Sequence, residues 1–396
     1  MNMNNQMEEA ESSILHTYNR FPVVFERGEG VHLFDSEGSK YLDFAAGIAV
    51  NSLGYHYPGY DEALKEQINK LTHISNLYYN EPIIEAGAKL VNASRMDKAF
   101  FTNSGTEAIE GALKAAKKYA YERDGHANHE IIAMNHSFHG RSIGALSVTG
   151  NAHYREPFEP LMGGVKFADF NDLESVKAQI TDKTCAIIME TVQGEGGIYP
   201  AEREFLEGVR TLCNEKDILL ILDEIQCGMG RSGYYFAWQA YGVQPDIMTS
   251  AKALGCGVPV GAFVLGEKAA KASLEPGDHG TTYGGNPFVC AAVSKVFDIY
   301  ENDKIIEHVQ EMTPYLEQKL DEIVAKHECA ATRRGMGFMQ GIVIQGRPVG
   351  EVVKAALAKG LLVISAGSDV LRIVPPLVIT KEHIDKMAAI LDECME

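Results

Sequence analysis

The sequence has no closely spaced pair of cysteines. Its seven cysteines are scattered, and they occupy positions 185, 213, 227, 256, 290, 329 and 394. Disulfide frameworks and structural zinc sites both depend on regular cysteine spacing, so neither is expected. We therefore predict reduced thiols and no metal site.

Positive charge is also scarce. The chain has 36 lysines and arginines against 54 aspartates and glutamates, which gives a formal net charge of −18 and a pI near 5.2. Nucleic acid and anionic lipid would both be repelled by this mean charge. Small molecules are therefore the expected partners, with no nucleic acid and no membrane surface among them.

Long apolar runs are missing as well. No stretch approaches the roughly 18 consecutive apolar residues of a membrane-spanning helix. The first residues, MNMNNQMEEAESS, have neither the hydrophobic core of a secretory signal nor the arginines of a transit peptide. We expect the protein to stay in the cytoplasm.

What the sequence does contain is enough apolar residues for a sizeable core. Its 396 residues are 45% hydrophobic, which suits one large domain and a smaller one. Short apolar runs alternate with segments of helical period, a pattern that predicts an α/β fold around a mostly parallel sheet. The run Ile218–Leu222 has no polar alternation, so both faces of that sheet should be covered. The predicted strands are Lys98–Thr102, Ile131–Met134, Cys185–Met189, Ile218–Asp223, Asp246–Thr249 and Gly261–Leu265.

The pattern changes after Pro287. Long amphipathic helices, short strands and a last helix from Lys381 predict a second, α+β unit. A strand pair around the turn Ser36–Ser39 is expected to pack with it. The predicted elements are strands Val31–Asp35 and Lys40–Phe44, helices Phe288–Asn302 and Lys304–His327, and strands Met339–Ile344, Leu361–Ile364 and Val370–Val374. The predicted division is an N-terminal arm at 1–47 that joins the small domain, a large domain at 48–287 and a small α+β domain at 288–396.

Polar residues follow several of the predicted strands, at the edge where an open parallel sheet collects ligands. Ser104, Gly105 and Thr106 follow the first strand and open a helix, whose exposed N–H groups favour a phosphate. The alternative is a capping box between Ser104 and Glu107 that needs no ligand. The sequence predicts a phosphate cradle or a plain helix cap at this point.

An acid and a lysine end two further strands. Asp223 ends a wholly apolar strand, where a cationic ring N–H could satisfy it, although a helix N-cap would explain it as well. Lys252 lies among small apolar residues, where it could lose its proton and attack an aldehyde. Most lysines are solvated surface residues, which is the alternative for Lys252.

An aromatic ring and an arginine follow the strand Ile131–Met134. Phe138 could stack on a flat ring and Arg141 could hold a carboxylate, or the two could be a core aromatic and a surface charge. All of these features lie at the carboxyl edge of one predicted sheet: the phosphate cradle, the aromatic ring of Phe138, Asp223, Lys252 and Arg141. This coincidence favours a single active site.

The motifs around these residues resemble the class III (subgroup III) aminotransferases, from Phe21 to about Thr380. The segments that carry the resemblance are Phe101–Ala108, Phe138–Arg141, Gln193–Gly197, Leu222–Gln226 and Gly280–Pro287. The resemblance implies pyridoxal 5′-phosphate (PLP) as cofactor and the fold type I architecture, with a seven-stranded sheet in the large domain. It also implies a homodimer with shared active sites.

The resemblance assigns a role to each matching position. Lys252 would bind the cofactor aldehyde and move the substrate proton, and Asp223 would keep the ring nitrogen protonated. Gln226 would hydrogen-bond the ring hydroxyl, and Phe138 would cover the ring. The phosphate would be bound by Ser104, Gly105 and Thr106, together with Thr282 of the neighbouring subunit.

Two arginines and a glutamate would handle the substrates. Arg141 and Arg372 resemble the family's carboxylate clamps. Glu195 resembles its gate, which pairs with Arg372 for the diamine and releases it for 2-oxoglutarate or glutamate. The alternative is an inert ion pair between Glu195 and Arg372.

Within the family, the residues favour the branch that acts on acylated diamines. Ile48 stands where the ornithine branch has a tyrosine, which leaves room for an N-acyl group, and Tyr18 stands where an aromatic hydroxyl approaches the substrate carboxylate. The implied reaction is reversible transfer of the δ-amino group of N-acetyl-L-ornithine to 2-oxoglutarate, giving N-acetylglutamate 5-semialdehyde and glutamate in arginine biosynthesis. Thr191 departs from the pattern, because relatives usually show proline there, and the expected effect is on loop stiffness.

Several alternatives stay open at this point. Ornithine, succinylornithine, N-succinyl-diaminopimelate and γ-aminobutyrate aminotransferases share the same core chemistry. A PLP-dependent aminomutase would need no 2-oxo acid acceptor. A non-catalytic relative would be expected to have lost Lys252 or Asp223, and both are present.

Overall fold

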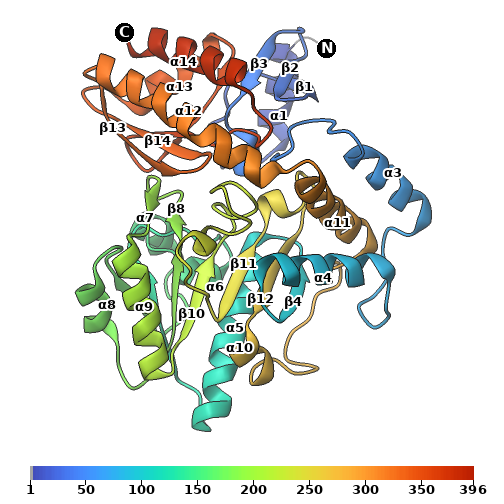
Figure 1. Cartoon of the computed structure of the whole chain (residues 1–396), viewed down its shortest axis with the longest axis vertical. Coiled ribbons are helices and arrows are strands. Elements are labelled where there is room, and N and C mark those ends of the chain that lie inside the picture. Colours follow the sequence, from blue (N-terminus) through green and yellow to red (C-terminus); the bar gives the residue numbers. More distant parts are fainter. Residues whose placement is uncertain (1–2) are drawn as a thin grey trace.

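The computed structural model describes residues 3–396, and a seven-stranded sheet flanked by helices lies at its centre (Figure 1). The strands run across this sheet in the order β4-β12-β11-β10-β7-β5-β6. β12 is antiparallel to β11 and β4, whereas the other neighbours pair in parallel. The predicted α/β class with a mostly parallel seven-stranded sheet is therefore confirmed. The bounds are β4 Lys98–Thr102, β5 Glu130–Met134, β6 Val165–Ala168, β7 Thr184–Glu190, β10 Leu219–Asp223, β11 Ile247–Ser250 and β12 Gly261–Leu265.

Strand β10 shows why this sheet is covered on both faces. All five of its residues are buried. Leu219 and Ile221 belong to one buried cluster and Leu220 and Leu222 to another, because successive side chains of a strand point to opposite faces. α5 supplies residues to the first cluster and α9 to the second. The helices of this part are α3 Tyr60–Lys70, α4 Glu81–Ser94, α5 Gly105–Asp124, α6 Ile143–Ser147, α7 Ala152–Arg155, α8 Leu173–Gln179, α9 Arg203–Lys216 and α10 Glu267–Lys271.

The two ends of the chain share a smaller sheet. β1 Phe25–Glu29, β2 His32–Asp35 and β3 Lys40–Asp43 pair in antiparallel order, and β3 pairs in parallel with β15 Leu361–Leu362. The prediction that the N-terminal strand pair packs with the C-terminal part is therefore confirmed. A short helix, α1 Met3–Ser13, precedes these strands.

One predicted strand is wrong. The sequence predicts a single strand over Leu361–Ile364, but β15 ends at Leu362 and β16 Ile364–Ala366 belongs to a different sheet. The apolar run contributes to two sheets, because the chain leaves one sheet at Val363 and enters the other. Apolar character alone does not show which strand a segment pairs with. The second sheet has the order β13-β14-β17-β16, with β13 Ala330–Met336, β14 Met339–Ile344 and β17 Val370–Ile373.

The predicted C-terminal helices are present, with ends that differ by a few residues. They are α11 Pro287–Asn302, α12 Ile305–Lys326 and α14 Lys381–Met395, joined by α13 Val349–Ala358. α11 packs against α3 and α4 of the central part. The division at 1–47, 48–287 and 288–396 stays a prediction, and its first two residues lie outside the described range. Among the described residues, no helix has both the length and the apolar character needed to cross a membrane.

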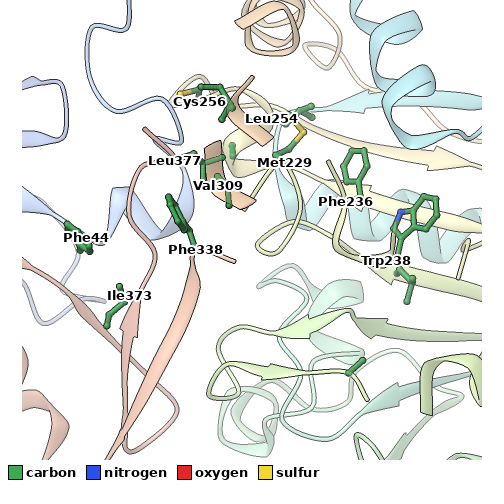
Figure 2. Packing of buried hydrophobic residues seen from close by; sticks show 14 of the residues in the cluster. Phe44, Met229, Phe236, Trp238, Leu254, Cys256, Val309, Phe338, Ile373 and Leu377 are labelled. Carbon is green, nitrogen blue, oxygen red and sulfur yellow. The ribbon is translucent and has the colours of Figure 1, made fainter. Parts of the chain in front are cut away.

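The core continues from the central part into the C-terminal part. Figure 2 shows Val309, Phe338 and Leu377 close to Met229 and Cys256, and these five residues belong to one buried cluster. β17 ends four residues before Leu377. The shared core therefore holds β17 in place relative to the carboxyl edge of the central sheet.

Candidate active site

A cavity of about 500 Å³ opens at the carboxyl ends of β4, β10 and β11. Residues that follow these strands line it, because parallel strands end at the same edge of a sheet. A cavity of this size suits a small ligand. The predicted site residues that the structure brings together in its lining are Ser104, Gly105, Thr106, Phe138, Arg141, Asp223, Gln226 and Lys252.

Lys252 comes two residues after β11 and opens the 3₁₀ helix Lys252–Leu254. Its backbone has a φ of 50°, a region that side chains other than glycine seldom occupy and that collects at functional sites. Burial lowers the pKa of the Lys252 amine to about 8, because desolvation disfavours the ammonium form. The neutral, nucleophilic amine is therefore accessible close to neutral pH.

Asp223, the last residue of β10, is held on both carboxylate oxygens. Oδ2 lies 2.7 Å from Nδ1 of His139, and Oδ1 accepts hydrogen bonds from the Thr249 hydroxyl at 3.2 Å and from the Ile225 N–H at 3.0 Å. Nε2 of His139 is buried and has no hydrogen-bond partner within the described chain. His139 is a site residue that sequence reasoning missed, although it stands between Phe138 and Arg141 in the motif quoted above.

Helix α5 begins at the cavity. Ser104 is its N-cap, and the Ser104 hydroxyl accepts from the Glu107 N–H at 3.3 Å. The side chain of Glu107 accepts instead from the N–H of Asn103 at 2.6 Å, so the reciprocal half of the predicted capping box is not formed. The first intrahelical bond runs from Ala108 N to Ser104 O. Because the Glu107 N–H is bound to the Ser104 hydroxyl, the N–H groups of Gly105 and Thr106 are the ones left for an anion.

Phe138 and Arg141 also line the cavity. The Arg141 guanidinium stacks 3.9 Å above the Tyr154 ring and lies 5.4 Å from the Phe138 ring. Arg141 is exposed and makes no ion pair with any residue from 3 to 396, so its charge is available to a ligand. Phe138 is half-buried and presents a flat apolar face to the cavity.

Glu195, Gln226 and Arg372 form a closed cluster. Nη1 of Arg372 donates to Oε1 of Glu195 and, at 3.0 Å, to Oε1 of Gln226. Burial acts to raise the pKa of Glu195, but the charge of Arg372 and its hydrogen bond outweigh burial and lower that pKa. Gln226 lines the small cavity, whereas Arg372 lines a larger one of about 1380 Å³. The cluster therefore forms the wall between two cavities.

Besides Glu195 and Arg372, three predicted residues do not line the small cavity. Ile48 lines the larger cavity together with Arg372 and is 43% exposed. Tyr18 is 71% exposed, and the segment that lines the larger cavity begins with the next residue, Asn19. Thr282 lies exposed on a surface loop. Neither Tyr18 nor Thr282 is brought to the site within this chain.

Two buried carboxylates were not predicted. Glu190 ends β7 and lines the small cavity, where it accepts from the N–H groups of Gly194 at 3.0 Å and Phe138 at 3.2 Å. Glu224 follows Asp223 and accepts from the Thr191 hydroxyl at 2.6 Å. Burial raises the pKa of each of the two glutamates to about 7. The signal for Glu190 was present, since it ends an unbroken apolar strand as Asp223 does.

The lining fits PLP at both ends. A Cβ added at Gly105 would come within 2.9 Å of Cδ1 of Ile225, so this glycine lets the start of α5 approach the cavity closely enough to hold a phosphate. Asp223, backed by His139, offers an anionic carboxylate to a protonated ring nitrogen. Lys252 offers an amine to an aldehyde. Aldehyde, ring nitrogen and phosphate each find a chemically suited partner.

Comparison with known proteins gives a consistent answer. The chain matches the Aminotransferase class-III family over residues 14–395. It is 46% identical over 397 residues to the acetylornithine aminotransferase of Methanocaldococcus jannaschii. This alignment covers 99% of this chain and 98% of that protein.

Solved structures agree with this match. The chain is similar to the ornithine aminotransferase of Toxoplasma gondii, whose structure is described as having partial occupancy of PLP at the active site, with a TM-score of 0.95, 28% identity and coverage of 100% and 94% of the two chains. It is also similar to the acetylornithine aminotransferase of Elizabethkingia anophelis, with a TM-score of 0.88, 31% identity and coverage of 100% and 99%. As its motifs predict, the chain belongs to the class III aminotransferases.

Proposed function

We propose that this chain transfers the δ-amino group of N-acetyl-L-ornithine reversibly to 2-oxoglutarate, with PLP as cofactor. The observation that carries the proposal is the half-buried side chain of Lys252, with its lowered pKa, in one cavity with Asp223 and the start of α5. The substrate is supported by the 46% identical relative, which is an acetylornithine aminotransferase. Both substrates are small molecules, as the composition predicts.

The cofactor would be held from three sides. The start of α5, with Ser104, Gly105 and Thr106, would bind the phosphate through backbone N–H groups and the positive end of the helix. Phe138 would cover the ring, and Gln226 would hydrogen-bond the ring hydroxyl. When bound, PLP supplies an aldehyde and a ring that accepts the electrons left on the substrate carbon.

Asp223 would keep the ring nitrogen protonated, and His139 is proposed as its support. The bond of 2.7 Å from His139 fixes one oxygen of Asp223 and the bond from Thr249 fixes the other. An oriented carboxylate beside the ring nitrogen favours the protonated ring. This arrangement makes His139 a positioning residue and Asp223 the residue that acts on the cofactor.

Lys252 would do the covalent and proton work. Its neutral amine would hold the cofactor through the aldehyde, with release of water, and once freed by the substrate amine it would move a proton between the substrate carbon and the cofactor. A pKa of about 8 lets the same group take and return a proton at physiological pH. Glu190 would hold the surrounding loops, because it binds the backbone of Phe138 and Gly194.

The substrate carboxylates would be bound by Arg141 and Arg372. Arg141 has no partner carboxylate among the described residues and is therefore ready for the α-carboxylate of either substrate. Arg372 is paired with Glu195, so it would accept the second carboxylate of 2-oxoglutarate or glutamate only when Glu195 moves away. This exchange would let one pocket serve a diamine and a dicarboxylate.

A homodimer with shared active sites is part of the proposal. A surface segment carries several exposed large apolar side chains, and such patches mark interfaces. The Asn76 amide donates to Gly284 O at 2.8 Å, which joins this segment to the loop that carries Thr282. A partner chain seated there would receive Thr282 near its own phosphate site. The exposed residues are Leu77 at 87%, Tyr78 at 64%, Tyr79 at 95% and Tyr283 at 62%.

The choice among amine donors rests on Ile48 and Tyr18. Ile48 leaves room in the larger cavity for an acyl group, and Tyr18 precedes the segment that lines it. Ornithine, succinylornithine, N-succinyl-diaminopimelate and γ-aminobutyrate are the same-class alternatives, and a panel of donors separates them.

A cytoplasmic location and the division of the chain into domains after residues 47 and 287 complete the proposal. The location is supported by seven cysteines that are all free.

The test is the visible absorption of the purified, PLP-loaded protein before and after N-acetylornithine is added without any 2-oxo acid. Loss of the yellow band, with ornithine far slower, supports cofactor, reaction and donor together. An unchanged band with N-acetylornithine but a loss with another donor overturns the substrate. A band lost with glutamate and with no panel donor leaves an aminotransferase of a different donor class.

A further inference from the structure

Four consecutive residues of the chain have a left-handed backbone. The φ angles of Ala46, Gly47, Ile48 and Ala49 are 48°, 62°, 66° and 61°. The segment is the short helix α2 Ala46–Ala49, and it is one turn of a left-handed helix. Only glycine occupies this region without a steric penalty, and L side chains visit it as single residues rather than in runs. The branched side chain of Ile48 makes its position the most strained of the four.

The buried carboxylate of Asp43 holds the start of this turn. Oδ1 accepts hydrogen bonds from the N–H groups of Ala45 at 2.9 Å and Ala46 at 2.8 Å. Oδ2 accepts from the Tyr55 hydroxyl at 2.8 Å. Asp43 is 1% exposed, so these bonds are shielded from water and the carboxylate has no competing solvent partner.

Hydrogen bonds inside the turn continue this support. Ala45 O accepts from the N–H groups of Ile48 and Ala49, at 2.9 and 3.0 Å, and Ala46 O accepts from the Val50 N–H at 2.7 Å. Three N–H groups at the turn are therefore paired with carbonyl groups of the same segment. A strained conformation persists when its surroundings determine it in this way.

The residues on either side of the turn are also hydrogen-bonded to the segment that follows Arg372. Phe44 O accepts from the Val374 N–H at 2.9 Å, and Ser52 O accepts from the Leu377 N–H at 2.6 Å. Both donors follow Arg372 within five residues. The turn and the carboxylate-binding strand β17 therefore have a fixed relative position.

The turn lies where the two cavities meet. Ile48 lines the larger cavity, together with Arg372, and Val50 lines the smaller cavity, together with Lys252. A right-handed turn at this place would point the Ile48 side chain in a different direction, because the two hands place Cβ differently. Left-handed geometry is therefore what puts Ile48 on the wall of the substrate cavity.

We propose that the left-handed turn Ala46–Ala49 is a strained support that fixes Ile48 as a boundary of the donor-binding cavity, and that Asp43 is the positioning residue that holds it. The proposal rests on the proposed function, because it assigns the cavity to an acylated diamine. Ile48 touches the donor, whereas Asp43 acts on donor choice only through the turn. A merely structural Asp43 would change stability and leave donor choice unaltered.

The strain is tested by two truncations of one side chain. At an unstrained position an Ala variant is more stable than a Gly variant, because glycine has more backbone freedom to lose. At a left-handed position the order reverses. In the PLP-loaded protein we expect Ile48→Gly to unfold at a temperature about 2 °C or more above that of Ile48→Ala. An Ile48→Ala variant that is equally stable or more stable would overturn the strain.

The positioning role is tested by donor choice, measured as the ratio of kcat/KM for N-acetylornithine to kcat/KM for ornithine. We expect Asp43→Ala to change this ratio about tenfold and Asp43→Asn, which keeps the oxygen that binds Ala45 and Ala46, to change it less than about twofold. In the Ile48→Gly background, Asp43→Ala should have no further effect on the ratio, because there is no side chain left to position. An unchanged ratio, or an equal effect in both backgrounds, would overturn the proposal.

A further variant and a further substrate keep the outcome decidable. If Asp43→Ala does not fold, Tyr55→Phe removes one bond to the same carboxylate, and a ratio shifted by about twofold or more supports the role while an unshifted ratio overturns it. Bleaching of the yellow band by glutamate is measured for every variant. A wild-type protein that responds to glutamate but not to N-acetylornithine contradicts the proposed function, and the Tm comparison at Ile48 still tests the strained turn.

Discussion

The carboxylate of Glu195 and the guanidinium of Arg372 form an ion pair at the wall between the two cavities. The two partners differ in how they are held. Arg372 is 3% exposed, lies within β17 and also donates to Ser365 O at 3.1 Å. Glu195 lies in the glycine-rich loop Gly194–Gly197 and is less buried. If the pair opens, the glutamate is therefore the partner that moves and the arginine is the one that stays.

We predict that Glu195→Gln shifts the enzyme from the diamine toward the dicarboxylate. Without the carboxylate, the charge of Arg372 has no partner when the diamine is bound, whereas glutamate brings its own partner for that charge. The ratio of single-turnover rates with N-acetylornithine and with glutamate should fall about tenfold or more. Glu204→Gln, on the exposed side of α9, is the control. Equal losses in both half-reactions would mean that the ion pair is inert.

Lys252→Ala should abolish turnover and leave the fold intact. The variant lacks both the group that attacks the cofactor aldehyde and the group that moves the substrate proton, so we expect kcat to fall by about 10⁴ or more. Thermal unfolding should remain cooperative. Lys216→Ala, at the exposed end of α9, is expected to behave like the wild type. Turnover of Lys252→Ala within tenfold of wild type would contradict the assignment.

The lowered pKa of Lys252 predicts how cofactor attachment depends on pH. Only the neutral amine attacks an aldehyde, and the amine is mostly protonated below its pKa of about 8. When PLP is added to the cofactor-free protein, the rate at which the yellow band appears should rise about tenfold per pH unit below pH 8 and level off above it. A rate that still climbs steeply between pH 9 and 10 would mean that the amine is not desolvated.

Replacement of Ile48 by a larger residue tests the room for the acyl group. Ile48→Tyr should narrow the larger cavity near Arg372, so we expect kcat/KM to fall about tenfold more for N-acetylornithine than for ornithine. Ile48→Val, which is smaller but also branched, should leave the ratio of the two donors nearly unchanged. Equal losses for both donors after Ile48→Tyr would mean that Ile48 does not face the acyl group.

Much of the central sheet could be predicted, because its strands are buried on both faces and their apolar runs are unbroken. Two edge strands, β1 and β6, were not predicted. In β1, four of five residues are exposed, and in β6 the short run Val165–Ala168 is mostly half-buried and includes Lys166. Because most of their side chains face solvent and not a core, these strands have no run of apolar residues that sequence analysis could detect. The partner of a strand is decided by the fold, as the split after Leu362 shows.

The site divides in the same way. Residues at the carboxyl ends of buried strands, such as Asp223 and Lys252, could be placed from local sequence, because the sheet brings those ends together. The partner of Asp223 could not, since His139 lies 84 positions away in the sequence and meets it only through the fold. Thr282 could not be placed either. Its proposed role is at the phosphate site of a second chain, and the sequence pattern of one chain does not show how two chains pack.

At Thr191 the sequence motifs predict a departure from the family's usual proline, and the structure gives the Thr191 side chain a partner. We expected an effect on loop stiffness, but the Thr191 hydroxyl donates to the buried Glu224 at 2.6 Å. Burial raises the pKa of Glu224 to about 7, above its value in the unfolded chain. The folded state therefore binds the extra proton between about pH 4.5 and 7, and stability falls as the pH rises through that window.

This hydroxyl bond favours the charged form of Glu224, so its loss should matter most when Glu224 is ionised. We predict that Thr191→Val destabilises the folded protein by about 1.5–3 kcal/mol at pH 8 and by about 1 kcal/mol at pH 6, where the carboxyl group is mostly protonated. Urea unfolding at the two pH values measures the difference. Thr191→Ser keeps the hydroxyl and should lose little at either pH. An equal loss for Thr191→Val at both pH values would show that packing of the side chain matters and its hydrogen bond to Glu224 does not.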